Sequence, residues 1–280
     1  MMKNIILGLS LVLCAGYISG QGLEKVIVEK YYISDARDAA AFGGQLLVGS
    51  VTYRIFVDML PGYRFQAAYG IPGHELRLAT TTLFFNNEDK GGIVSSVIPY
   101  RNLKDNTVML DSWLSAGGAA EGSFGILKTM DDGVETIVNE KGILQNSDPG
   151  AGIPIKVQDG LIAGMPPKVT SFGIDSIVDV FKNRTIGSEF STTNGSWATM
   201  NGAIGPDSID NKVLIAQITT NGVFTFELNI QIGKPAGGVE NYVAKNPVAK
   251  EIQLSSLAYP ETALTGKKDS KDTGRNENNK

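Results

Sequence analysis

The sequence predicts an all-β fold, more specifically an antiparallel β-sandwich, from three observations. Apolar and polar residues alternate in short stretches, tight-turn dipeptides separate several of these stretches, and glycine occurs 33 times in 280 residues. Alternation with a period of two is typical of strands with one buried face. Short strands between glycine-rich turns are typical of sandwiches and barrels, and they do not distinguish a jelly roll from an immunoglobulin-like sandwich.

The clearest alternation lies on both sides of Pro61-Gly62. Residues 51–58 and 63–69 both alternate between the two kinds of side chain. Proline followed by glycine fits the two central positions of a type II turn. The sequence therefore predicts a β-hairpin in which these two strands pair, each with one face buried.

A second hairpin is predicted around Asn221-Gly222, because this dipeptide favours a type I′ two-residue turn. The hairpin would join residues 212–220 to residues 223–232 and place Gln217 opposite Phe226 on the buried face. A buried amide without partners costs about 1–3 kcal/mol. We therefore expect the Gln217 side chain to bond the backbone of a neighbouring strand or loop and to fix the register of the core.

The rest of the chain adds further short elements. Residues 35–42 and 176–182 are predicted as short helices, and residues 145–168, with four prolines and four glycines, as a linker or a long surface loop. We expect one domain over residues 21–264, because the two predicted hairpins lie on opposite sides of that loop and each needs a partner sheet. The other predicted strands are 25–33, 75–85, 108–114, 124–130, 197–201 and 252–257.

The first 20 residues match a secretory signal peptide. Lys3 stands in a short basic start, and the apolar run at 5–15 is about half of the roughly 20 residues that span a bilayer. We expect cleavage near residue 21. Cys14, the sole cysteine, follows a leucine, whereas a lipoprotein signal has a small residue there. The mature chain would then contain no thiol, which excludes a disulfide-stapled scaffold and a cysteine metal site.

The charge disfavours nucleic acid and anionic membranes as partners. The chain has 25 basic and 29 acidic residues, a net charge of −4. Without the signal peptide and the polar tail at 265–280, 19 basic and 26 acidic residues remain, a net charge of −7. An acidic body repels phosphate backbones. No later stretch has the length of a membrane span, so an integral membrane protein is not expected. The tail lacks aromatic and β-branched runs and is predicted to be disordered.

Few residues are arranged for catalysis. His74, the sole histidine, is expected to be an exposed or capping residue of a turn, and no Gly-x-Ser-x-Gly motif accompanies it. A hydrolase that uses two carboxylates is the alternative, because glycosidases need only such a pair at the right separation. A protein that is not an enzyme is favoured, because the candidate acids have no distinguishing spacing: Asp58, Glu88, Asp89, Asp111 and Glu227.

Two loops are rich in the oxygen ligands that calcium prefers. Asn87 and Asp89 follow an apolar strand, and Asp207 and Asp210 precede residues 212–220. Neither loop has the EF-hand pattern, and Asn and Asp also bond their own backbone in ordinary turns. Turns are therefore the favoured interpretation, with calcium binding as the alternative.

The two tryptophans are a weaker lead to a binding site. Trp113 and Trp197 could stack on sugar rings, but their strand-like surroundings favour positions in the core.

Five runs occur in order along the chain: 49–55 (GSVTYRI), 61–63 (PGY), 84–87 (FFNN), 111–114 (DSWL) and 213–217 (VLIAQ). Together they resemble a group of exported β-domain proteins of Bacteroidota bacteria. The resemblance covers roughly residues 22–257 and implies export and a β fold, but no activity. Related chains often continue into a sorting domain for type IX secretion, whereas this sequence ends in its polar tail. Both the periplasm and the cell surface are therefore expected locations.

The resemblance also implies O-glycosylation at Asp-Ser or Asp-Thr followed by an apolar residue. Ser176 and Ser208 match this pattern, in DSI at 175–177 and at 207–209. A glycan on Ser208 would argue against a closed metal site at Asp207.

These observations predict an exported binding or structural module of the cell envelope. It would recognise a protein or a glycan through loops at the ends of the sandwich, with no cofactor except calcium. The alternatives are a carbohydrate-active hydrolase and a filament subunit with a long unpaired edge strand.

Overall fold

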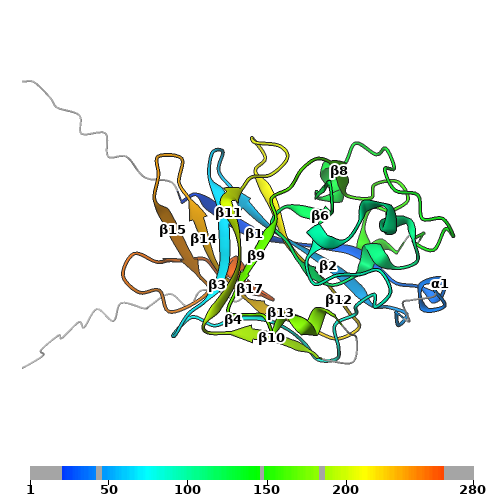
Figure 1. The fold of residues 1–280 in the computed structure, drawn as a ribbon, viewed down its shortest axis with the longest axis horizontal. Coiled ribbons are helices and arrows are strands. Elements are labelled where there is room, and N and C mark those ends of the chain that lie inside the picture. Colours follow the sequence, from blue (N-terminus) through cyan, green and yellow to red (C-terminus); the bar gives the residue numbers. More distant parts are fainter. Residues whose placement is uncertain (1–20, 42–45, 146–147, 183–186, 262–280) are drawn as a thin grey trace, which may run out of the picture.

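Seventeen strands in the described residues form four sheets, so the chain is all-β, as predicted. The computed structural model describes residues 21–41, 46–145, 148–182 and 187–261 (Figure 1). The expected signal peptide with Cys14, the end of the helix predicted at 35–42, and the tail at 265–280 lie outside these residues. All strand pairs are antiparallel except β15 with β16, which are parallel.

The sheets draw their strands from distant parts of the sequence. The first has the order β1 (Leu23–Ile33), β2 (Val51–Met59), β12 (Lys212–Thr220) and β5 (Trp113–Leu114). The second has the order β10 (Glu189–Thr192), β4 (Leu76–Thr80), β13 (Phe224–Glu227) and β17 (Ala258–Tyr259). The third has the order β16 (Ile252–Gln253), β15 (Val239–Val243), β14 (Asn229–Gly233), β3 (Arg64–Gly70), β11 (Gly195–Ala203) and β9 (Val169–Phe172). The fourth has the order β6 (Gly118–Ala120), β7 (Ser123–Gly125) and β8 (Leu161–Ala163).

The turn at Pro61-Gly62 forms, but the predicted hairpin around it is wrong. Gly62 has φ +84°, and the Tyr63 N–H donates to the Leu60 carbonyl at 3.2 Å. However, β2 pairs with β1 and β12, while β3 pairs with β11 and β14. The turn therefore leads from one sheet to another, because both hydrogen-bonding edges of β2 are already occupied by other strands.

The second predicted hairpin is wrong for the same reason. Asn221-Gly222 follows β12, but β13 pairs with β4 and β17 in the second sheet. The strand β12 is buried on both faces, and a bulge between Leu214 and Ala216 shifts its alternation. Gln217 is fully buried, as predicted. Its side chain bonds the backbone at residues 109–111, whereas Phe226 pairs with strands of the second sheet, so the face predicted for Gln217 is wrong.

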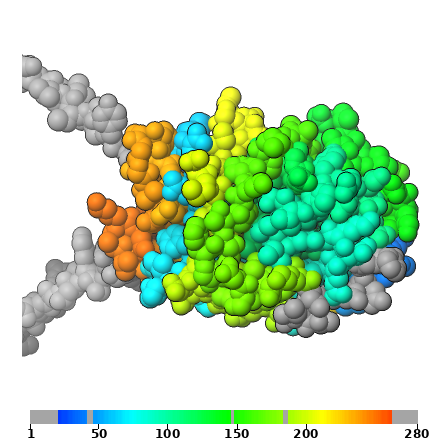
Figure 2. Space-filling view, in the orientation of Figure 1, coloured from blue at the N-terminus to red at the C-terminus, as the bar shows by residue number. Residues whose placement is uncertain are grey.

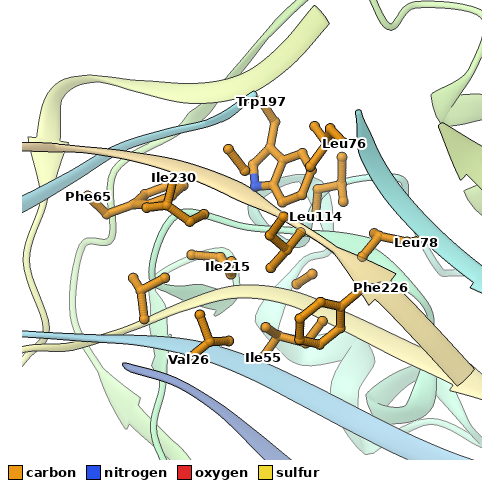
Figure 3. Packing of buried hydrophobic residues seen from close by; sticks show 14 of the residues in the cluster. Val26, Ile55, Phe65, Leu76, Leu78, Leu114, Trp197, Ile215, Phe226 and Ile230 are labelled. Carbon is orange, nitrogen blue, oxygen red and sulfur yellow. The ribbon is translucent and has the colours of Figure 1, made fainter. Parts of the chain in front are cut away.

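The main core is shared by the first three sheets. Its aromatic residues include Trp197, and Trp113 is also buried, so the core positions predicted for the two tryptophans are confirmed. Figure 3 shows side chains from different sheets directed into this interior: Val26, Ile55 and Ile215 from the first, Leu76, Leu78 and Phe226 from the second, and Phe65, Trp197 and Ile230 from the third.

An irregular layer packs against the first sheet around a second cluster of buried residues. The described residues between 85 and 163, apart from β5, form it, mostly as loops, short 3-10 turns and the small fourth sheet. Figure 2 shows this teal and green segment on one side of the molecule, away from the orange strands at the other end. The second cluster joins Tyr31, Phe56 and Leu214 of the first sheet to Met109, Ile143 and Leu161 of the layer.

Other predicted elements are present with different bounds. Residues 75–85 contribute only β4, and the described part of 145–168 contains a 3-10 turn and β8, which pairs with β7. The predicted helix at 35–42 is α1 (Ala36–Ala39), and none of the described helices could span a membrane. The 3-10 turns are Ser95–Val97, Tyr100–Lys104, Val108–Leu110, Lys128–Met130, Pro149–Ala151, Val178–Phe181 and Ser255–Leu257.

The N-terminus of α1 has a buried carboxylate. Asp38 Oδ2 accepts the Asp35 N–H at 2.7 Å and the Tyr32 hydroxyl at 3.1 Å, while Oδ1 is buried without a partner among the described residues. Burial raises the pKa of Asp38 to about 6. Between the ordinary value of 3.8 and about 6, the folded chain therefore holds a proton that the unfolded chain has released.

This linkage predicts that stability falls as the pH rises through that interval. We expect Asp38→Asn to raise the unfolding free energy at pH 8 by about 1–3 kcal/mol, because the amide keeps the acceptor and removes the buried charge. At pH 4 the gain should nearly vanish. Urea unfolding at pH 8 and pH 4 measures the difference in unfolding free energy between the variant and the unmodified protein at each pH. A variant that is less stable than the unmodified protein at pH 8 would contradict this account.

Candidate functional site

The first candidate calcium loop is used for local hydrogen bonding. Asn87 is buried; its Oδ1 accepts the Lys90 N–H at 2.9 Å, and its Nδ2 donates to Thr107 Oγ1 at 3.3 Å. Asp89 lies beside it, in a charged hollow near Lys90. The structure thus uses Asn87 as a turn residue.

The second candidate loop is an exposed turn. Asp207 Oδ1 accepts the backbone N–H of Ile209 at 2.8 Å and of Asp210 at 3.3 Å, and Asp210 lies 3.3 Å from Lys212 Nζ. In the described ranges, no group of three or more His, Cys, Asp or Glu side chains is placed to hold a metal ion. Calcium binding at Asn87, Asp89, Asp207 and Asp210 stays a prediction.

The two serines of the glycosylation pattern are both exposed. Ser176 lies in the turn at 175–177, and Ser208 lies in the exposed loop at 206–210. A modifying enzyme could reach both, so O-glycosylation stays a prediction.

The candidate acids do not gather in one place. Asp58 lies 3.6 Å from Lys212 Nζ, and Glu227 pairs with Lys245 at 2.7 Å. Asp111 is buried and accepts the backbone N–H groups of Asn87 and Gly92. Burial raises the pKa of Asp111 well above its ordinary value, and these two donors oppose the shift.

A buried polar network joins the first sheet to the irregular layer. Arg54 on β2 donates from Nε to Gln217 Oε1 and from Nη1 to the Gly160 carbonyl, both at 2.9 Å. Its guanidinium lies 3.5 Å from the centre of the Tyr31 ring. Gln217 in turn donates to the carbonyls of Met109 at 2.9 Å and Asp111 at 2.7 Å.

Lys128 makes a second connection of the same kind. Its ammonium donates to the carbonyls of Tyr31, Ala151 and Ile153, and its backbone N–H donates to Glu29 Oε1 at 2.8 Å. Burial lowers the pKa of Lys128 to about 8 and raises the pKa of Glu29. The buried side chains thus supply donors to irregular backbone that has no strand partner, which is a structural role.

A second polar site lies on the outer face of the third sheet. It is a hollow of about 370 Å³, which we call the sheet hollow, lined by Ala67, Tyr69, Ile71, Ser196, Gln231, Asn241 and Glu251. Register brings these residues together: Gln231 lies opposite both Ala67 and Asn241, and Tyr69 lies opposite Ser196. Strands β15, β14, β3 and β11 lie side by side at one end of the molecule (Figure 1).

The sheet hollow presents both donors and acceptors. Gln231 Nε2 donates to Asn241 Oδ1 at 3.0 Å, so the described residues leave Gln231 Oε1 as an acceptor and Asn241 Nδ2 as a donor. Tyr69 and Ser196 are half-buried and add hydroxyl groups. Burial raises the pKa of Tyr69 to about 12, and the nearby Glu251 carboxylate adds to this shift, so the hydroxyl keeps its proton.

The position of His74 corrects the expectation of an exposed residue. His74 is 4% exposed, and its Nε2 lies 2.9 Å from Glu251 Oε2. Its turn is closed by reciprocal backbone bonds with Ile71 at 2.9 Å, and Asn229 Nδ2 bonds the His74 carbonyl at 3.2 Å. No local pattern predicts this pair, because 177 positions separate its members and only the fold brings them together.

Comparison with protein-family models, curated proteins and solved structures finds no match. The function must therefore be inferred from the geometry of the sheet hollow.

Proposed function

We propose that the chain is an exported, non-catalytic β-sandwich module of the cell envelope that binds a glycan in the sheet hollow. The apolar run at 5–15 and the resemblance to exported proteins support export. The core common to the first three sheets supports the sandwich.

One observation carries the proposal: a polar hollow with a small-residue floor on a regular sheet face. Ala67 and Ser196 are small and leave space. Tyr69 adds an aromatic side chain with a hydroxyl, and Gln231 and Asn241 add an acceptor and a donor. Sugar hydroxyls both donate and accept hydrogen bonds, so they match such a mixed lining. Fixed polar groups on strands also hold a ligand more precisely than loops do.

In this proposal the glycan binds on a sheet face. The sequence had suggested loops at the ends of the sandwich instead. The hollow has one carboxylate, Glu251, among its described lining residues, whereas a two-acid glycosidase needs a pair. Four buried acids have raised pKa values, Glu29, Asp38, Asp111 and Asp159. Each accepts backbone N–H groups and so helps to hold irregular segments of the chain. These features favour binding over hydrolysis.

Filling the hollow should abolish binding. Ala67 is half-buried on the outer face, so Ala67→Trp would occupy the ligand's space while leaving the main core unchanged. We expect at least a tenfold loss of affinity for the polysaccharide fraction extracted from the envelope of the cells that make this protein. Affinity electrophoresis and calorimetry measure the loss.

Thr225→Trp is the matched control, because Thr225 is a small, half-buried residue on β13 of the second sheet. It should bind as the unmodified protein does. Equal binding by both variants, or no binding by the unmodified protein of the fraction either as extracted or after reduction of its carboxyl groups, would refute the proposed function.

A further inference from the structure

Resting on this proposed function, we propose that Glu251 makes the sheet hollow selective for uncharged glycans and excludes acidic ones. Glu251 is thus a specificity-determining residue, and the ligand class is a neutral, hydroxylated saccharide.

The carboxylate is partly engaged and partly free. Oε2 lies 2.9 Å from His74 Nε2 and accepts the Val248 N–H at 2.8 Å. The described residues leave Oε1 without a hydrogen-bond donor, and the residue lines the hollow. A free carboxylate oxygen accepts strong, charge-assisted bonds from hydroxyl groups.

The carboxylate is also fixed in place. Its side chain is 11% exposed, and the His74 side chain that holds it is 5% exposed. Asn229 Nδ2 donates to the carbonyls of Tyr69, His74 and Glu75, which ties the histidine turn to the sheet. Glu251 therefore cannot swing away when an anionic ligand approaches.

None of the described lining residues carries a positive charge that would compensate an added negative one. The other polar lining groups, on Tyr69, Ser196, Gln231 and Asn241, are neutral. Lys250 is exposed next to Glu251 in the chain and is not among the lining residues. A uronate placed here would face a like charge in a partly desolvated site, which opposes binding.

The test uses pairs of polysaccharides that differ only in charge. The probes are polygalacturonate, alginate, hyaluronate and the extracted envelope polysaccharide, each before and after chemical reduction of its carboxyl groups to alcohols. The unmodified protein should bind at least one reduced form at least tenfold more tightly than the native acid. Glu251→Gln keeps an acceptor for His74 and Val248, and it should narrow that ratio at least fivefold.

Glu189→Gln serves as the control, because Glu189 is an exposed residue on the separate second sheet, paired with Arg77. It removes one negative charge from a residue that does not line the hollow, and it should leave the ratio unchanged. Tight binding of the native acids, or an unchanged ratio in Glu251→Gln with a native-like unfolding temperature, would overturn the inference alone. Failure to bind any neutral or acidic form would overturn the proposed function as well.

Discussion

Replacing Gln217 by leucine is expected to lower the free energy of unfolding by about 3–5 kcal/mol, because three buried groups would lose a partner at about 1–3 kcal/mol each. These groups are Arg54 Nε and the carbonyls of Met109 and Asp111. Leucine has nearly the volume of glutamine, so the loss reports the hydrogen bonds more than a cavity. Urea unfolding monitored by tryptophan fluorescence measures it.

The control is Gln253→Leu. Gln253 is exposed, and its single bond to the Ala244 carbonyl is long, at 3.2 Å. Its replacement should change stability by less than about 0.5 kcal/mol. Similar effects of the two substitutions would mean that Gln217 does not secure the irregular layer.

Arg54→Met should have an effect of similar size, about 3–5 kcal/mol, because it removes a buried cation and leaves its partners unpaired. Gln217 Oε1 and the Gly160 carbonyl would each lose a donor, and Glu29 would lose a favourable charge. Arg54→Lys should recover little of the lost stability. An ammonium cannot make both hydrogen bonds of the guanidinium, to Gln217 and to Gly160, or stack on Tyr31.

Arg77→Met is the matched control for this second prediction. Arg77 forms an exposed ion pair with Glu189 at 2.7 Å, so its loss should cost less than about 1 kcal/mol. The irregular layer should also loosen in Arg54→Met, which hydrogen exchange at residues 126 and 161 would detect as faster exchange. A stable variant with unchanged exchange would contradict the role of the network.

The sequence predicted where the chain turns, but it did not predict which strands pair with each other. Pro61-Gly62 and Asn221-Gly222 both mark places where the chain leaves a strand, as their turn chemistry requires. Turn chemistry does not reveal whether the edge of the preceding strand is free. Both β2 and β12 lie inside a sheet, so the strand that follows each turn joins a different sheet.

The burial of Gln217 was predicted correctly, whereas its face was not. Its burial was predicted from a pairing with Phe226 that the structure does not contain, and the position is buried because β12 is buried on both faces. One bulge at 214–216 then moved Gln217 to the opposite face, where Arg54 and the loop carbonyls satisfy its amide. A single inserted residue reverses every later side chain of a strand, and alternation alone cannot place it.

The sheet hollow was not predicted, because its lining residues form no motif along the sequence. Tyr69, Ser196, Gln231 and Asn241 come from four strands that only the sheet order brings together. Dense polar loops such as 86–89 and 207–211 stand out in the sequence instead, but their side chains bond their own backbone. A local pattern detects turns well, whereas a site spread across a sheet leaves no local pattern.

The most direct test of the central claim is a nuclear magnetic resonance titration with oligosaccharides from the envelope polysaccharide. Side-chain amide groups give their own signals, so Gln231 and Asn241 report directly on the sheet hollow. The account predicts that these two signals and the backbone amide signals of Tyr69, Ser196 and Glu251 shift in a saturable way. Shifts confined to the loops at 85–163, or signals of Gln231 and Asn241 that do not move at saturation, would contradict it.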